Sequence, residues 1–310
     1  MSPLGDGIHL IDALYQRPGV VAFYLVVAGG RAAFVDTGTA HAQPQALAAL
    51  AACGLGPEAV DYVIPTHVHL DHAGGAGAMM QRFPNAQVVV HPRGAPHLID
   101  PARLIDGATA VYGADTMARM FGTIVPVAAE RVVEAPDEYV LSVGDRRLRL
   151  LDTPGHARHH LCVVDEASGS IFTGDTFGIS YRAFDGVRGA FIFPAATPTQ
   201  FDPQALHGSI DRLLAERPRQ ILLTHFGAVT EVERLGADLH QCIDAYVAMA
   251  KAVPVGPGRH AALVDGQRAI VTRLLRQQGC SLAPAAVEQV LADDYELNAQ
   301  GLAVWLDRGA

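Results

Sequence analysis

The sequence predicts a layered α/β fold, and three observations support this prediction. Two apolar runs, at 20–27 and 31–35, are joined by Gly29-Gly30, which is typical of a β-hairpin. An alanine-rich stretch at 44–52 has the composition of a helix. Strand and helix patterns then alternate along the chain, as they do in folds whose strands and helices form separate layers.

The predicted elements come in two sets of similar order, so the two halves of the main fold resemble one another. The first set comprises strands at 8–11, 20–27 and 31–35, a helix at 44–52, a strand at 62–64, a helix at about 76–83 and a strand at 87–90. The second comprises strands within about 139–173, a helix around 203–216 and a strand at 220–224.

Two regions lie outside this pattern. An insert at about 92–130 has apolar residues at helical spacing, which indicates packing helices or an oligomer contact. Alternatively, the insert roofs the functional site together with the loop 177–201, whose apolar side chains would form a wall: Phe177, Tyr181, Phe184, Phe191, Ile192 and Phe193. No strand pattern is convincing after residue 225, whereas helical periodicity covers 231–252, 260–278 and 283–307. We therefore expect a main domain at 1–230 and a helical extension at 231–310, which could mediate a homodimer.

Composition and charge narrow the class of protein. The chain has 310 residues, half of them hydrophobic, which is enough for a substantial core. No apolar run approaches the ~18 residues of a membrane span, and no signal-peptide pattern begins the chain, so we expect a cytoplasmic protein without a membrane partner. The net charge of -9 and the lack of a Lys/Arg cluster argue against a nucleic-acid partner. The four cysteines form no C-x-x-C pair and are expected to be free thiols.

Residues 66–75 read Thr-His-Val-His-Leu-Asp-His-Ala-Gly-Gly and hold three imidazoles and a carboxylate within six positions. Imidazole nitrogens and carboxylate oxygens are ligands of zinc and related divalent ions. In extended backbone His67 and His69 point to the same side, so both could bind one ion. Asp71 and His72 follow in a turn and could face a second ion. The alternative is a surface histidine cluster without metal.

Further potential ligands follow strand patterns later in the chain. His156, Asp175 and His225 each come shortly after an apolar run, and upstream Asp36 follows one directly. Loops at strand ends meet at one rim of a sheet, where functional groups are usually displayed. The chain is therefore predicted to be a metalloenzyme. The remaining histidines lack convergent spacing and are expected to be surface or structural residues: His9, His41, His91, His97, His207, His240 and His260.

These motifs resemble those of the metallo-β-lactamase-fold hydrolase superfamily, in its glyoxalase II and lactonase-like branch. The signatures H-x-H-x-D-H, T-P-G-H, G-D and a last histidine occur in the family's order and span most of the chain. The resemblance implies a four-layer αββα sandwich, in which two facing mixed β-sheets carry outer helices. It also implies two divalent metal ions, with zinc favoured over iron or manganese.

The resemblance assigns a role to each ligand. His67, His69 and His156 would bind the first ion, Asp71, His72 and His225 the second, and Asp175 would bridge them. Asp36 would brace the ligand loop through hydrogen bonds without touching metal, and His160 could orient a ligand. His159 would face solvent or a substrate channel.

Such a centre would lower the pKa of water and provide a metal-bridging hydroxide as nucleophile. The predicted function is hydrolysis of a small carboxylic ester, lactone or thioester. We expect Asp71 to orient the hydroxide and to pass a proton to the leaving group. Tyr181 could donate to a carbonyl oxygen, as a phenol does in some lactonases of the superfamily.

Two other functions stay open. Persulfide dioxygenases and diiron proteins of the superfamily are iron-dependent oxidoreductases, although the first use fewer ligands and the second carry a flavin domain. A non-catalytic relative is disfavoured because no ligand position is replaced. A glutathione thioester is a doubtful substrate, because the segment after Asp175 lacks the residues that glyoxalase II enzymes place there.

Overall fold

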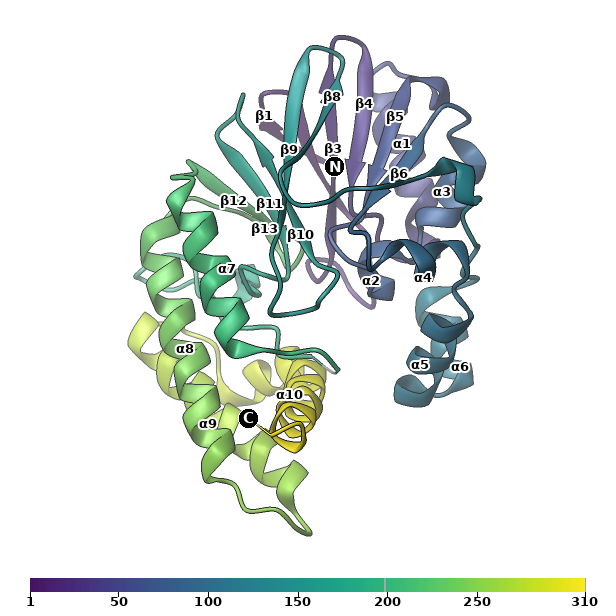
Figure 1. Cartoon of the computed structure of the whole chain (residues 1–310). Helices are drawn as coiled ribbons and strands as arrows, with labels where there is room; N and C mark the ends of the chain where they lie inside the picture. The colour runs from purple at the N-terminus through teal and green to yellow at the C-terminus, as the bar shows by residue number, and fades with distance from the viewer. Residues whose placement is uncertain (198, 310) are drawn as a thin grey trace. The chain divides into compact units, whose positions relative to one another are not determined.

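The computed structural model describes residues 1–197 and 199–309, which form two compact units (Figure 1). The first unit comprises 1–152, 159–174 and 221–228. The second comprises 153–158, 175–220 and the chain from 229 onward. Each unit therefore contains segments that are far apart in the sequence, and the simpler division at residue 230 stays a prediction.

A seven-stranded sheet forms the first half of the first unit. Its strands follow chain order, with the first four antiparallel and the last four parallel to one another. They are β1 Ser2–Gly5, β2 Ile8–Asp12, β3 Ala22–Ala28, β4 Arg31–Val35, β5 Val60–Ile64, β6 Gln87–Val90 and β7 Val132–Glu134. Gly29 and Gly30 turn the β3–β4 hairpin with φ of 55° and 74°, which suits glycine, so the predicted hairpin is confirmed.

A six-stranded sheet forms the other half, in the order β13-β12-β11-β10-β9-β8. Its strands are β8 Tyr139–Val143, β9 Arg146–Asp152, β10 Leu161–Asp165, β11 Ser170–Gly174, β12 Gln220–Leu223 and β13 Gly227–Val229. Strands β8 to β11 are antiparallel neighbours. Strand β13 corrects the expectation of no strand after residue 225, because three residues are too few to show an alternating pattern.

One hydrophobic core lies between the two sheets. Tyr24 and Val35 of the first sheet pack with Leu150 and Phe172 of the second, and all four side chains are at most 1% exposed. The rings of Tyr24 and Phe172 meet edge to face with centroids 5.1 Å apart. The Tyr24 hydroxyl donates to the Leu223 carbonyl over 2.5 Å. The sheets therefore face one another, as predicted.

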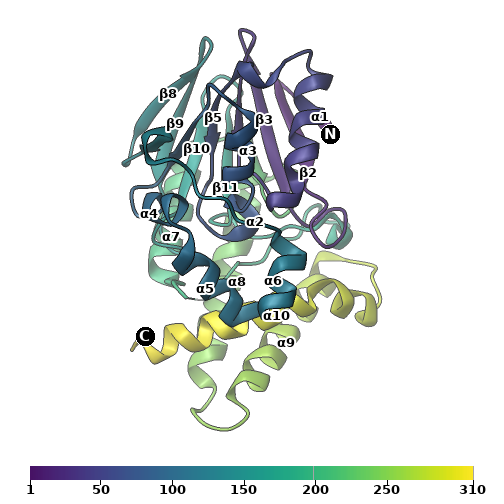
Figure 2. The ribbon, with the colours of Figure 1, turned by 90° about the vertical axis from the view of Figure 1, so that its right-hand side faces the viewer.

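Helices α1 (Gln43–Ala52) and α3 (Ala76–Arg82) cover the outer face of the seven-stranded sheet (Figure 2). The insert forms the three helices α4 Ala95–Ile99, α5 Ala102–Tyr112 and α6 Ala114–Phe121, which confirms its helical spacing. Met117 and Phe121 of α6 pack on Leu70, which begins the short helix α2 (Leu70–Ala73). The insert therefore supports the segment that carries Asp71 and His72.

The second unit is mostly helical. Its helices are α7 Pro203–Ala215, α8 Val232–Ala252, α9 Arg259–Gln278 and α10 Pro284–Asp307, and the last three confirm the predicted helices. The aromatic residues of the loop 177–201 are at most 6% exposed, and four of them pack against one another: Tyr181, Phe184, Phe191 and Phe193. Among residues 1–197 and 199–309, no helix has the length and apolar character needed to cross a membrane.

Candidate metal centre

The histidine-rich segment leaves β5 and turns into α2. His67 Nε2 lies 2.8 Å from His69 Nδ1, so two imidazole nitrogens face one another. His67 Nδ1 lies 3.2 Å from the Thr66 hydroxyl, which itself donates to Asp36. The hydroxyl therefore accepts from Nδ1, which leaves the Nε2 lone pair directed at His69. Either the N–H of His69 Nδ1 donates to this lone pair, or a cation lies between the two nitrogens.

Asp71, His72 and His225 form a second group in the same unit, with one ligand atom of each within 4.8 Å of the others. Asp71 Oδ2 lies 3.5 Å from His72 Nε2 and 3.3 Å from His225 Nε2. His225 Nδ1 donates to the Val20 carbonyl over 2.8 Å, and His72 Nδ1 donates to Asp36 over 2.9 Å. In the neutral rings both Nε2 atoms thus carry lone pairs aimed at a carboxylate, so the three side chains could hold a metal ion.

Asp36 ties these segments together. Its Oδ1 accepts from the backbone N–H and the hydroxyl of Thr66, at 2.7 and 2.9 Å, and its Oδ2 accepts from His72 and from the Thr224 hydroxyl, at 2.9 and 2.6 Å. The residue is 1% exposed and holds a φ of 59°, a region that few residues other than glycine adopt. One buried carboxylate therefore fixes the backbone before His67, His72 and the residue before His225.

The second unit carries the other two predicted ligands. His156 Nδ1 donates to the Ala195 carbonyl over 2.9 Å, and its Nε2 lies 3.3 Å from Asp175 Oδ2. Because a carbonyl only accepts, the Nε2 lone pair of the neutral ring faces the carboxylate. Gly155 precedes His156 at a φ of 135°, where an added Cβ would approach the Leu206 backbone to within 2.3 Å. Only glycine fits this turn, which presents His156.

His160 and His159 both pack beside the ligand segment in the first unit. His160 is fully buried, and its ring stacks on that of His67 with centroids 4.9 Å apart. His159 is only 6% exposed and lies 5.9 Å from the His69 ring and 6.2 Å from the His97 ring. Of the two expectations for His159, exposure to solvent is wrong, because the turn after β9 directs it towards these histidines, whereas a place in a substrate channel stays a prediction.

In the second unit, Tyr181 and the histidines His207 and His240 each contact another side chain. The Tyr181 phenol donates to Asp294 over 3.3 Å and is 4% exposed. His207 and His240, which were expected to be surface or structural residues, stack on one another. Sequence reasoning also missed Thr66 and Thr224. Each directly precedes a predicted ligand, and that shared position was the available signal.

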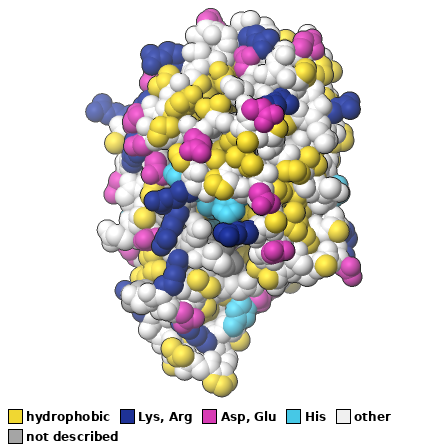
Figure 3. All heavy atoms as spheres, turned by 45° about the vertical axis from the view of Figure 1, so that its right-hand side comes forward, with side chains coloured by type: hydrophobic (Ala, Val, Ile, Leu, Met, Phe, Trp, Pro, Cys, Tyr) yellow, Lys and Arg dark blue, Asp and Glu magenta, His cyan; other side chains and the backbone are white. Residues whose placement is uncertain are grey.

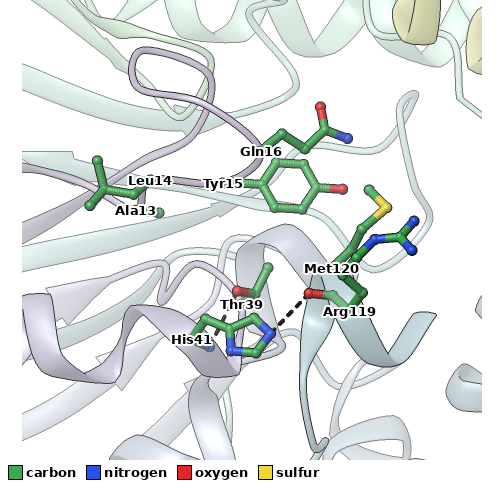
Figure 4. A pocket seen from close by; sticks show the side chains of 8 residues that line it. All are labelled: Ala13, Leu14, Tyr15, Gln16, Thr39, His41, Arg119 and Met120. Atoms are coloured by element: carbon green, nitrogen blue, oxygen red, sulfur yellow. Dashed lines mark hydrogen bonds between the residues drawn. The ribbon is translucent and has the colours of Figure 1, made fainter. Parts of the chain in front are cut away.

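A groove of about 520 Å³ opens in the first unit between the loop after β2 and helix α6 (Figure 4). Tyr15, Gln16, His41 and Arg119 line it, and the Asp12 carboxylate holds the loop by accepting from two backbone N–H groups, at 2.8 and 2.9 Å. Figure 3 shows one face of the molecule, where acidic and basic side chains are interspersed with apolar ones. The groove is therefore lined by apolar side chains such as Leu14 and Met120 together with polar ones, among them the Arg119 guanidinium.

Comparison with known proteins identifies relatives. The model of the metallo-beta-lactamase superfamily matches residues 17–225. A metallo-beta-lactamase fold-containing protein of Sulfurisphaera tokodaii is 30% identical over 174 residues, which span 55% of this chain and 62% of that protein. Acyl-coenzyme A thioesterase MBLAC2 of Gallus gallus is 30% identical over 187 residues (56% and 64%). An N-acyl homoserine lactonase of Bacillus thuringiensis is 28% identical over 184 residues (58% and 60%). Each match covers less than two thirds of the relative.

Solved structures resemble nearly the whole chain. A metallo-beta-lactamase family protein from Thermus thermophilus has a TM-score of 0.71 at 21% identity and covers 99% of this chain and 95% of its own. An archaeal superfamily protein from Sulfolobus tokodaii has a TM-score of 0.69 at 22% identity, with coverage of 96% and 99%. At this identity the likeness concerns the fold alone, and it confirms the predicted sandwich with its C-terminal helices.

Proposed function

Because the chain belongs to the metallo-beta-lactamase superfamily, we propose that it is a metal-dependent hydrolase of a small carboxylic ester, lactone or thioester. Its curated relatives include proteins named as a thioesterase, a lactonase and a hydroxyacylglutathione hydrolase, all of which cleave an acyl bond. The identities of 28–32% over part of each relative leave the substrate of this chain to be determined.

The observation that carries the proposal is the state of the imidazoles around Asp71. His72 and His225 donate through Nδ1 to acceptors that cannot donate back, so both Nε2 lone pairs point at one carboxylate. Without a cation these atoms would repel one another in a largely buried place. The donor set of nitrogen and oxygen suits zinc, and also iron or manganese.

We propose two ion positions. His67, His69 and His156 would bind one ion, Asp71, His72 and His225 the other, and Asp175 would bridge both. The facing nitrogens of His67 and His69 support the first position, as does the directed Nε2 of His156. When bound, such a pair lowers the pKa of water and so supplies hydroxide at neutral pH.

The residues of the chain would divide the remaining work. Asp71 is 23% exposed, whereas His72 beside it is fully buried. Asp71 is therefore the member of its group that a substrate can reach, and we assign to it the orientation of the attacking water and the proton transfer to the leaving group. Asp36, Thr66 and Thr224 would hold the ligands in place. A role for Tyr181 as a donor to the substrate carbonyl stays a prediction.

The substrate would be a small molecule. Tyr15 and Met120 in the groove could bind an apolar acyl group, and Arg119, whose guanidinium donates to the Thr116 hydroxyl over 3.4 Å, could bind an anionic part. A homodimer and a cytoplasmic location stay predictions as well.

The test is hydrolysis of a panel of lactones, thioesters and aryl esters by protein of measured metal content. We expect turnover of at least one class, lost in a His69→Ala variant and kept in His260→Ala, which alters an exposed histidine on α9. Metal analysis accompanies the assay. Bound iron with oxygen uptake on a thiol substrate, and no hydrolysis, would instead establish an oxidoreductase.

A further inference from the structure

A second pair of facing imidazoles lies between helices α7 and α8. His207 of α7 and His240 of α8 stack with ring centroids 4.8 Å apart and planes 14° from parallel. Their Nδ1 atoms are 2.5 Å apart. Neither residue belongs to the centre proposed above, and both lie in the second unit.

Each ring is held from its other side by a carboxylate of the opposite helix. His207 Nε2 lies 3.2 Å from Asp244 Oδ1 on α8, and His240 Nε2 lies 3.1 Å from Asp211 Oδ1 on α7. In each helix the aspartate comes four residues after the histidine, on the same face. The two helices therefore contribute identical halves of a reciprocal arrangement.

Counting protons shows that this arrangement needs a cation. A carboxylate oxygen accepts hydrogen bonds, so each Nε2 carries the proton of its hydrogen bond. A neutral imidazole with its proton on Nε2 has a lone pair on Nδ1. The two Nδ1 lone pairs would then face one another at 2.5 Å and repel, unless a proton or a metal ion lies between them.

Charge and surroundings favour a metal ion over a shared proton. Two carboxylates contribute two negative charges, which a divalent ion neutralises and a single proton does not. A carboxylate that accepts from one imidazole nitrogen while the other nitrogen binds metal is a recurring feature of metal sites. Both rings are 24% exposed, so an ion can enter from solvent and water can complete its coordination.

We propose that His207 and His240 bind one divalent transition-metal ion through both Nδ1 atoms and thereby clip α7 to α8. Imidazole nitrogens select zinc, nickel or copper(II) over magnesium and calcium. With metal–nitrogen bonds of about 2.0–2.1 Å, the two nitrogens would separate to about 3.3 Å, which needs only a small rotation of the rings. The site stands whether or not the chain is a hydrolase.

The experiment counts ions on the protein after the centre proposed above is saturated with zinc and free metal is removed. Titration calorimetry with nickel(II) should show one further ion per chain in the wild type. His207→Ala and His240→Ala should lose that ion, while His260→Ala should keep it, because His260 faces the Glu296 carboxylate at 2.6 Å and is not a member of the His207–His240 pair. Asp211→Asn and Asp244→Asn should weaken binding by about 10–100-fold. Hydrolysis should be unchanged in all these variants.

A spectroscopic measurement on the unaltered chain removes any dependence on how the variants fold. One equivalent of copper(II), added to the zinc-saturated protein, should give an electron paramagnetic resonance spectrum with coupling to two nitrogens. Coupling to one nitrogen or none would overturn the proposal. So would equal nickel stoichiometry in the wild type and both alanine variants, or a wild type that binds no further ion and shares only a proton between the rings.

Discussion

The two histidine clusters of this protein orient their imidazole rings in different ways. Around Asp71 the histidines lie in loops that follow separate strands, and buried acceptors fix their protons. His207 and His240 lie on the helices α7 and α8, and exposed aspartates fix the protons of their rings. In both clusters one ring nitrogen of each imidazole donates to an acceptor, and the other ring nitrogen then faces the centre of the cluster. The acceptor therefore indicates a possible metal site better than the histidine alone.

The clusters differ in how firmly they are held. Asp36 receives four hydrogen bonds in the interior, so the strands and the ligand loops are organised before any ion arrives. Asp211 and Asp244 are 70% and 74% exposed, so solvent competes for their hydrogen bonds. We expect substitutions to have large effects in the first cluster and moderate ones in the second.

The largest effect is expected at Asp71. Replacing Asp71 with Asn keeps the shape but removes the charge and the proton acceptor, so kcat should fall by about 10²–10⁴-fold. The measurement is turnover of the best substrate by protein whose metal content matches the wild type. Near-normal turnover in the metal-replete variant would contradict the role given to Asp71.

Asp36→Ala should come next. The substitution leaves the Thr66 N–H, His72 and Thr224 without their buried acceptor, which costs about 1–3 kcal/mol for each unsatisfied group. Metal affinity should also fall by about 10–100-fold, measured by competition with a coloured chelator. Asp100→Ala is the matched control, since that carboxylate is exposed and accepts from the nearby Ala102 N–H, at 3.2 Å. An equal loss of affinity in the control would show that Asp36 has no special role.

Metal removal should separate the clusters by their contribution to stability. An ion present at 1,000 times its Kd stabilises the folded state by about 4 kcal/mol. Chelation should therefore lower the Tm of the wild type markedly and that of His207→Ala almost as much, because the firmly held cluster contributes most. If the chelator no longer lowered the Tm of His207→Ala, the cluster around Asp71 would not be the one that contributes most to stability.

The smallest effect is expected for an ion pair whose residues belong to neither cluster. Arg268 of α9 donates to Glu288 of α10 over 2.7 and 2.8 Å, and these bonds lower the pKa of the Glu288 carboxyl. The pair therefore stabilises the fold above the usual carboxyl pKa, and the contribution is lost as the pH falls through the lowered pKa. Because both side chains are about 40% exposed, the contribution should be about 0.2–1 kcal/mol.

Urea unfolding of Glu288→Gln and wild type at several pH values measures the contribution of this ion pair to the free energy of unfolding. The two curves should differ slightly at neutral pH and converge in acid. A difference that grows as the pH falls would give the pair the wrong sign.

The sequence patterns predicted those elements and motifs that are continuous along the chain. The H-x-H-x-D-H segment, the hairpin at Gly29-Gly30 and the three C-terminal helices each have a continuous pattern, and the helices and hairpin are confirmed. Strands β1, β7 and β13 were not predicted, because three or four residues are too few to show an alternation of apolar and polar side chains. The carbonyls of Val20 and Ala195, which hold ligand histidines, belong to the backbone and leave no trace in side-chain chemistry.

The pairing of His207 with His240 was not predicted from the sequence for another reason. Its members are 33 residues apart, and only the packing of α7 on α8 brings them together. A signal did exist, since each histidine is followed four residues later by an aspartate within a predicted helix. One such spacing is common on helices, and only the reciprocal arrangement of two gives it meaning.

The most direct test of the proposed centre is a metal titration of activity in the His207→Ala variant, where the additional site is removed. Protein stripped of metal should be inactive towards every ester, lactone and thioester tested, and turnover should return as zinc is added and level off at two ions per chain. Full turnover by the stripped protein would contradict the account, as would saturation without any zinc bound at the predicted ligands.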